Sequence, residues 1–430
     1  MNKIKIILKN EYIFSISTRI LIALSGLFTQ VIASRYLGAE LKGQTAYILS
    51  FTNLSSIVFL FGLSSLYPSF RTKSIDKKVA VDEYMTISTI IFSLYYVIIV
   101  ISTSILKIEN LEINTALLLT PIYCYSSVSG MVALVENPNK RNRGMLFIGF
   151  FELLIIFLLF IFTKKSFLFG VVTICAAEIM KVCYFISILK FNFNINLIKK
   201  ETLKYILENG LVLMISALLI TLSYKINILM LKYFKNISLA EIGVYSVGIS
   251  IAEKTFLIPD AIKEILLSRL SKNINEKEVA KMARISFAIG LIVSVVIAVF
   301  SYPLISILFG NEFKNAFGVT SITVFGVSFI VFMKMIDSYN QVMLLQKANI
   351  IMLLISIIFN ISINFYFIPN FGIYGAAFSM MLSYICSGFL FVVFFNIRTK
   401  IPITKIIFLQ KDDYKFILDL INFKINRVEK

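Results

Sequence analysis

Glu253 and Lys254 stand side by side inside an apolar run that is long enough to cross a bilayer. A charge at the bilayer centre costs roughly 2.5–3.5 kcal/mol on insertion scales, so each must reach water or a partner on another helix. Adjacent helix residues point about 100° apart and cannot simply pair along one face. Pro259 follows and can kink the run, turning backbone carbonyls toward a cavity. We expect either two structural ion pairs with other helices or a polar cavity in which Lys254 binds an anion.

Seven further charged residues interrupt apolar runs: Arg19, Glu152, Glu178, Lys181, Lys225, Lys334 and Asp337. Glu178 and Lys181 are three residues apart and share one helix face, which predicts a local ion pair. The same spacing predicts a local pair between Lys334 and Asp337 near the inner end of their run. The alternative for Glu178 is a site for a coupling ion. Glu152 is a lone carboxylate and is expected either to pair with a basic residue or to carry a proton.

Arg19 and Lys225 join Lys254 as candidates for binding an anionic substrate. A guanidinium does not lose its proton, so Arg19 must find an anion or water. It could instead extend to the nearby membrane surface, since long basic side chains keep their charged ends in water. Lys225 either extends outward in the same way or faces a translocation path.

The composition is that of an integral membrane protein. Of 430 residues, 58% are hydrophobic and 15% are charged, whereas soluble domains are near half apolar and a quarter charged. Histidine is absent and no phosphate-binding or dinucleotide-binding motif is present, so we expect no enzyme, no catalytic residue and no cofactor. The four cysteines lack metal-ligand spacing, so no metal site is expected.

Twelve apolar runs are long enough to cross the hydrocarbon core, which takes about 20 helical residues. They lie at 12–34, 44–68, 84–106, 113–135, 145–163, 167–189, 209–231, 242–262, 285–308, 316–339, 348–368 and 372–395. The runs are continuous rather than alternating, which favours helices over strands. The sequence therefore predicts an all-α membrane protein with about 12 transmembrane helices.

Basic residues set the orientation of these helices. With both termini inside, 29 of the 42 Lys and Arg residues fall in cytoplasmic segments and 8 in outer loops. This asymmetry and contact with anionic membrane lipids account for the net charge of +18, so no nucleic acid partner is expected. We expect a multi-pass protein of the bacterial cytoplasmic (inner) membrane.

The runs divide into two sets of six around the linker FNFNINLIKKETLKY. We expect an N-terminal lobe at 1–200, a C-terminal lobe at 201–395 and a cytoplasmic tail at 396–430. Within the tail, 412–430 is either an amphipathic helix on the membrane or a solvated terminus. RYLGAELKGQTAYILSF and KYFKNISLAEIGVYSVGIS open corresponding runs of the two halves with a similar order of basic residue, Tyr, polar loop, Gly and Tyr. Parallel repeats around a central cavity suit alternating access.

Several segments resemble the polysaccharide repeat-unit flippases, the Wzx-type O-antigen and capsule transporters of the MATE-like exporter superfamily. They are YLGAELKGQTAY, KINILMLKYFKNISLAEIGVYSVGISIAEKTFLIPDAI, YPLISILFGNEFKNA and the stretch 340–385, with its pattern at Asn364, Ile368, Pro369, Gly372, Gly375 and Ala376. Many members of that family carry an acidic residue where this chain has Asn227, so ion coupling here would need another group.

The resemblance implies two six-helix lobes that form a V around a central cavity. It also implies that the substrate is an undecaprenyl-pyrophosphate-linked oligosaccharide flipped to the outer leaflet for O-antigen, capsule or another glycan. Pyrophosphate favours Arg and Lys, so Arg19, Lys225 and Lys254 are the candidate ligands. The sugar would meet Asn360 and Asn364, one turn apart. The remaining candidates, Glu152, Glu178 and Glu253, would bind H⁺ or Na⁺.

Two other functions are the alternatives to a flippase. A cation-coupled multidrug exporter of the same superfamily would also use a charged cavity. A membrane polymerase or ligase would need a larger extramembrane element than the short outer loops provide. If the chain is the flippase, the polymerase and chain-length proteins of the same pathway are its expected partners.

Overall fold

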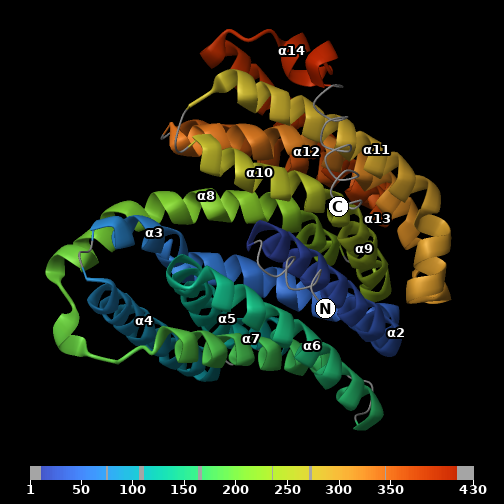
Figure 1. Ribbon diagram of the computed structural model, residues 1–430. Coiled ribbons are helices and arrows are strands. Elements are labelled where there is room, and N and C mark those ends of the chain that lie inside the picture. Colours follow the sequence, from blue (N-terminus) through green and yellow to red (C-terminus); the bar gives the residue numbers. More distant parts are fainter. Residues whose placement is uncertain are drawn as a thin grey trace, which may run out of the picture. The chain divides into compact units, whose positions relative to one another are not determined.

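The computed structural model describes residues 11–73, 76–105, 111–162, 167–234, 236–270, 274–343 and 345–413, and this part of the chain is helical without strands (Figure 1). The helices are α2 (Glu11–Leu60), α3 (Leu63–Lys73), α4 (Lys77–Ile105), α5 (Leu111–Glu136), α6 (Pro138–Phe162), α7 (Phe167–Leu189), η1 (Ile195–Leu197), α8 (Lys200–Tyr233), α9 (Leu239–Ala252), η2 (Glu253–Phe256), α10 (Leu257–Leu270), α11 (Glu276–Phe309), η3 (Asn311–Phe313), α12 (Ala316–Val342), α13 (Gln346–Thr399) and α14 (Ile403–Ile407). The all-α prediction is confirmed.

Within these described residues, seven helices are long and apolar enough to cross a membrane, and α2 with α3 forms an eighth candidate as a bent pair. Two of the helices each contain two of the predicted runs. In α2 the runs meet at Gly38 (φ 77°, ψ 175°), and in α13 they meet at Gly372 (φ 57°, ψ −133°). Glycine adopts positive φ without a steric penalty, so each residue lets the chain turn between two spans.

The described helices form two compact units. The first is Met1–Gly243 with Leu308–Glu312, and the second is Val244–Ile307 with Phe313–Lys430. The first unit includes α8, the helix that the sequence assigns to the second half. The lobe borders at 200 and 395 stay predictions. Of the predicted amphipathic tail helix, all but Asp412 and Asp413 lies outside the described residues.

Buried aromatic residues hold the first unit together where α3, α4 and α5 meet. The rings of Tyr67 and Tyr84 are fully buried and pack edge to face with centroids 5.1 Å apart. The Tyr84 hydroxyl donates to the Leu63 carbonyl at 2.5 Å, and the Tyr67 hydroxyl donates to Glu136 Oε1 at 2.7 Å. Because each buried hydroxyl has a partner, the rings bring apolar area into the core without an unsatisfied polar group.

Two segments of the first unit cross at Gly43 and Gly243, so closely that neither position has room for a side chain. A Cβ atom on Gly43 would lie 1.7 Å from the carbonyl oxygen of Leu239, and one on Gly243 would lie 1.9 Å from that of Ala39. The contact is reciprocal, with the same offset in numbering between both pairs of residues. Reciprocal contacts are what a two-fold axis between equivalent segments produces. These are the two segments that share a residue order in the sequence.

Candidate functional site

Helices α5, α6 and α7 of the first unit gather four polar side chains from otherwise apolar spans. Lys181 Nζ lies 2.6 Å from Glu178 Oε1, and both side chains are largely buried. Glu152 on α6 interacts electrostatically with Lys181 and with Glu178. Tyr123 on α5 interacts in the same way with both carboxylates. The structure therefore brings together Glu152 and Glu178, two residues predicted separately as ion-coupling groups.

The charges in this cluster do not balance. Glu178 and Lys181 neutralise one another, and their local pairing along α7 is confirmed. Glu152 adds a second carboxylate, and the described residues place no second ammonium in the cluster, so its described members carry one surplus negative charge when both acids are ionised. A charge inside the membrane is costly, and binding one proton or one monovalent cation would remove it. Tyr123 can donate a hydrogen bond to such a site.

The sequence analysis did not identify Tyr123 as part of a site. It is one of 20 tyrosines, and no spacing distinguishes it from the others. Only the packing of α5 against α6 and α7 places it near the two carboxylates.

In the second unit, the eighth predicted run is broken at the residues that carry its charges. Helix α9 ends at Ala252, a 3₁₀ turn spans Glu253–Phe256, and α10 starts at Leu257. The Leu257 amide donates to the Lys254 carbonyl, a 3₁₀ bond in place of an α-helical one. Pro259 has no N–H to bond the carbonyl of Thr255, so the regular ladder cannot continue through this turn. The α-helical hydrogen-bond ladder is thus interrupted where the sequence predicts a kink.

Two ion pairs connect α10 to α12 beyond this turn. Lys334 Nζ lies 2.6 Å from Asp260 Oδ1, and Lys263 Nζ lies 2.8 Å from Asp337 Oδ2. The predicted pair between Lys334 and Asp337 is therefore wrong. The two share one face of α12 as expected, but that face meets α10, where Asp260 and Lys263 have the same three-residue spacing with opposite charges. Lys334 and Asp337 therefore each pair with a residue of α10 and not with one another.

Asp337 is the best satisfied of these charges. Asn349 Nδ2 donates to Asp337 Oδ1 at 2.7 Å, and Gln341 Nε2 donates to Asp337 Oδ2 at 2.6 Å. Asn340 in turn donates to Asn349 at 2.6 Å. These bonds, together with the ion pair to Lys263, fix α12 against α10 and α13.

Lys254 differs from its neighbouring lysines. Lys334 Nζ lies 3.7 Å from the centroid of the Phe256 ring, besides its bond to Asp260. Lys254 is half-buried and interacts electrostatically with Glu253, but within the described part of the chain no carboxylate forms a salt bridge with it. Lys254 is therefore the lysine of this group that has capacity for an anion.

The other predicted basic substrate residues lie on helices of the first unit. Lys225 is half-buried on α8 in the first unit, two residues from the fully buried Asn227. Arg19 lies on α2, but its side chain is outside the described residues. The substrate roles of Arg19 and Lys225 stay predictions.

Asn360 and Asn364 are buried on α13 and bond to each other. Asn364 Nδ2 donates to Asn360 Oδ1 at 2.9 Å, and Asn360 Nδ2 donates to the Ser379 carbonyl at 3.3 Å. Ser356 and Ser383 make a similar bridge at 3.2 Å. These bonds join the two arms of α13. Whether the amides also meet substrate stays a prediction.

A pocket of about 310 Å³ lies in the first unit, where α4 begins and α5 ends. Its lining includes Lys77, Lys78 and Glu136. Both lysines are already paired, Lys77 with Glu136 at 3.1 Å and Lys78 with Asp82 at 3.0 Å. The pocket therefore offers no surplus positive charge to an anion. Over the described residues, no group of three or more His, Cys, Asp or Glu side chains is placed to bind a metal.

No protein-family model and no curated protein matches the chain. Among solved structures, it is similar to an inward-facing multidrug resistance MATE family transporter of the MOP superfamily, with a TM-score of 0.72 and 15% identity over 88% of this chain and 94% of that one. It is also similar to the lipid II flippase MurJ in an inward closed conformation, with a TM-score of 0.66 and 16% identity over 92% and 89% of the two chains. A Vibrio cholerae MATE transporter, VcmN, gives a TM-score of 0.61 at 14% identity over 90% and 95%. These neighbours are transporters and flippases rather than enzymes, and the chain is a multi-pass membrane protein with the fold that MATE transporters share with the lipid II flippase MurJ.

Proposed function

We propose that this protein is a flippase that moves undecaprenyl-pyrophosphate-linked oligosaccharide repeat units from the cytoplasmic to the outer leaflet by alternating access. The fold shared with a lipid II flippase supports a lipid-linked substrate. The Wzx-like segments of the sequence support an oligosaccharide of surface polysaccharide synthesis. The membrane is the bacterial inner membrane, with both termini cytoplasmic, as the distribution of Lys and Arg favours.

The observation that best supports this proposal is the position of Lys254 and its lack of a salt bridge with any described residue. It lies in the 3₁₀ break of a membrane helix, where the regular hydrogen-bond ladder is interrupted. Its neighbour Lys334 is paired with Asp260, whereas the described residues provide no salt bridge for Lys254. A half-buried ammonium of this kind gains most from an anionic ligand, and a pyrophosphate is such a ligand. Arg19 and Lys225 are the further basic candidates.

The cluster of Glu152, Glu178, Lys181 and Tyr123 supports ion coupling. Its surplus carboxylate would be neutral in one step of the cycle and charged in another, which would couple transport to a gradient of H⁺ or Na⁺. Glu253, next to Lys254, is the third coupling candidate. The surface polymer would be an O-antigen, a capsule or another glycan, and the pathway's polymerase and chain-length proteins would be partners.

A cation-coupled multidrug exporter is the second candidate, because MATE transporters share the fold. A cationic drug would find no partner in Lys254, so the basic residues favour the flippase. Drug resistance on overexpression, with surface polymer unchanged, would support the exporter.

The test is to delete the gene and measure both the surface polysaccharide and the leaflet in which its lipid-linked repeat unit accumulates. The flippase proposal predicts loss of polymer and accumulation on the cytoplasmic leaflet. Restoration by the wild-type gene, but not by a variant with Arg19→Ala and Lys254→Ala, would support the binding residues. Normal polymer in the deletion strain would refute the proposal.

A further inference from the structure

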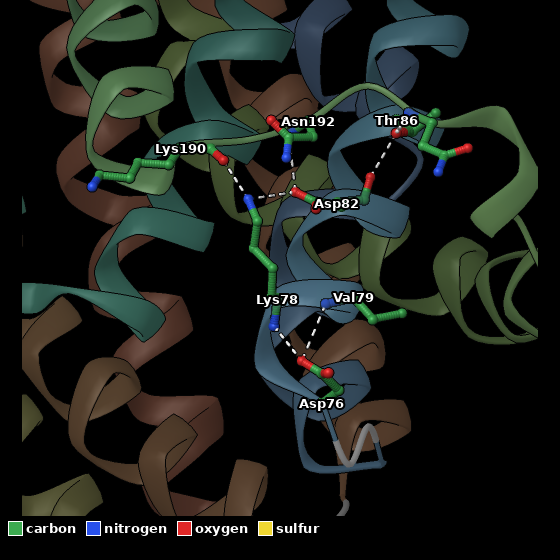
Figure 2. A network of polar contacts seen from close by, with 8 residues as sticks. Asp76, Lys78, Val79, Asp82, Thr86, Lys190 and Asn192 are labelled. Carbon is green, nitrogen blue, oxygen red and sulfur yellow. Dashed lines mark hydrogen bonds and ion pairs between the residues drawn. The ribbon is translucent and has the colours of Figure 1, made fainter.

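The linker between α7 and α8 is clamped along the start of α4 (Figure 2). Lys78 Nζ bonds both Asp82 Oδ1, at 3.0 Å, and the carbonyl of Lys190 at the end of α7. The same Asp82 oxygen accepts the Asn192 amide at 3.0 Å. One turn further along α4, Thr86 Oγ1 accepts the Asn194 amide at 3.2 Å. Alternate backbone amides of the linker are therefore fixed to one helix.

The clamp continues to the first turn of α8. Glu83 Oε1 accepts the Lys199 amide at 3.0 Å and the Thr202 hydroxyl at 2.6 Å. Helix starts leave N–H groups unpaired, and α8 has no cap from its own N-cap side chain, so Glu83 caps it from α4. Asp82 and Glu83 are 6% and 3% exposed. The linker is thus held by buried carboxylates and is not a free loop.

This clamp determines which side chains of the linker face outward. Phe191 packs against the core cluster that contains Tyr67 and Tyr84. Phe193 and Ile195 remain 53% and 60% exposed. Exposed lysines flank these two side chains; they are Lys190, Lys199 and Lys200. An ordered surface therefore presents two large apolar side chains between basic ends.

We propose that this surface, formed by residues 190–200, binds the headgroup region of anionic lipids, an interaction that goes beyond the proposed transport function. Helix α7 qualifies as a membrane span that ends at Leu189, so the linker begins at the level where the chain leaves the bilayer. Aromatic and aliphatic side chains are favoured at that level, and lysines there attract anionic lipid. Phe193 and Ile195 insert where the acyl chains join the headgroups, while the lysines contact the lipid phosphates.

Tryptophan quenching tests this proposal directly, because the chain contains no tryptophan. Phe193→Trp supplies a single reporter at an exposed position of the clamped linker. The purified full-length protein is reconstituted in vesicles of phosphatidylcholine mixed with phosphatidylglycerol, with bromine on the acyl chains of one lipid at a time. Phe150→Trp is the matched control, because Phe150 is 61% exposed on α6 within the predicted run 145–163 and has no lysine of the linker beside it in sequence.

We expect brominated phosphatidylglycerol to quench the Phe193→Trp reporter more strongly than brominated phosphatidylcholine at equal mole fraction. Adding Lys199→Gln and Lys200→Gln should abolish most of this preference, because it removes the two positive charges at one end of the linker. The Phe150→Trp control should be quenched equally by both lipids. Equal quenching of the linker reporter would overturn the preference for anionic lipid. If neither lipid quenches the reporter, the linker does not contact the membrane, and the proposal is wrong; a protein would then be the expected partner of this surface. Neither result depends on transport, so the proposed function is tested separately.

Discussion

Glu178 and Lys181 form a salt bridge of 2.6 Å inside the first unit, and Glu152 adds a second carboxylate beside it. Replacing Glu152 by Gln removes the surplus negative charge but leaves the salt bridge intact. We expect Glu152→Gln to fold normally and to lose the response of transport to an imposed gradient of H⁺ or Na⁺ in proteoliposomes. A variant that still responds to both gradients as the wild type does would exclude Glu152 from coupling.

Lys181→Ala removes the positive charge of the cluster and tests whether that charge stabilises the fold. It leaves two carboxylates close together without an ammonium, and breaking one partner from a buried pair costs about 3–5 kcal/mol. We expect a clear fall in melting temperature in detergent, partly recovered by adding Glu178→Gln. Lys204→Ala is the control, because Lys204 and Glu208 are exposed and 3.7 Å apart, and such pairs contribute about 0–1 kcal/mol. Equal effects of the two lysine variants would contradict the role of the cluster.

Lys254→Ala should impair substrate binding rather than stability, because no described carboxylate loses a salt bridge. A lost hydrogen bond to a charged group is worth about 1.5–3 kcal/mol, so the apparent affinity for a pyrophosphate-linked substrate should fall about tenfold or more. The measurement is binding of a labelled lipid-linked oligosaccharide to purified protein. Lys254→Arg should restore binding because it keeps the charge.

Lys334→Ala provides the contrast to Lys254→Ala. It leaves Asp260 without its partner at 2.6 Å and should lower the melting temperature while substrate affinity in the folded fraction stays unchanged. If Lys254→Ala destabilises the protein as Lys334→Ala does, the ammonium of Lys254 is structural and the pyrophosphate assignment fails.

Gly43 is expected to tolerate no side chain. A Cβ atom there would lie 1.7 Å from a backbone oxygen, so the two crossing segments must separate. Overpacking typically costs about 1–3 kcal/mol, and a clash with backbone should reach at least that range. We expect Gly43→Ala to reduce the yield and melting temperature of the protein. Gly26→Ala on the same helix is the control, since no heavy atom lies within 4 Å of its Cβ position. Equal stability of the two variants would contradict the close crossing.

The sequence predicted what depends on neighbours along the chain. Continuous apolar runs predicted the helices, and the three-residue spacing of Glu178 and Lys181 predicted their salt bridge. The same rule failed for Lys334 and Asp337, because both have partners 74 residues away on α10. Tyr123 was missed for the same reason, since only the packing of α5 against α6 and α7 gives it carboxylate neighbours. Spacing predicts which residues share a face but not which helix that face meets.

The chain segment after α13 is bound to α11 by a buried ion pair between Arg284 and Asp413, and Asp413 lies outside the candidate membrane spans. Asp413 is fully buried, and its two oxygens accept bonds from Nε of Arg284 at 2.5 Å and from Nη2 at 2.8 Å. A third nitrogen of Arg284 donates to the Lys405 carbonyl at 2.9 Å. Burial alone would raise the pKa of Asp413, but the bonds from Arg284 and the Gln410 amide and the charge of Arg284 outweigh it and hold the pKa below its ordinary 3.8.

A lowered carboxyl pKa stabilises the folded state at pH values above the ordinary pKa, and this contribution disappears as the pH falls through the folded-state value. We therefore expect residues 403–413 to stay protected from hydrogen exchange at neutral pH and to lose protection below about pH 4, before the spans unfold. Asp413→Asn should remove this pH dependence and leave the segment unprotected at neutral pH, because the amide cannot accept two charge-assisted bonds. Lys411→Gln is the control, since Lys411 is exposed and should leave the profile unchanged. Protection of 403–413 in the Asp413→Asn variant equal to that of the wild type would show that the ion pair does not hold this segment on α11.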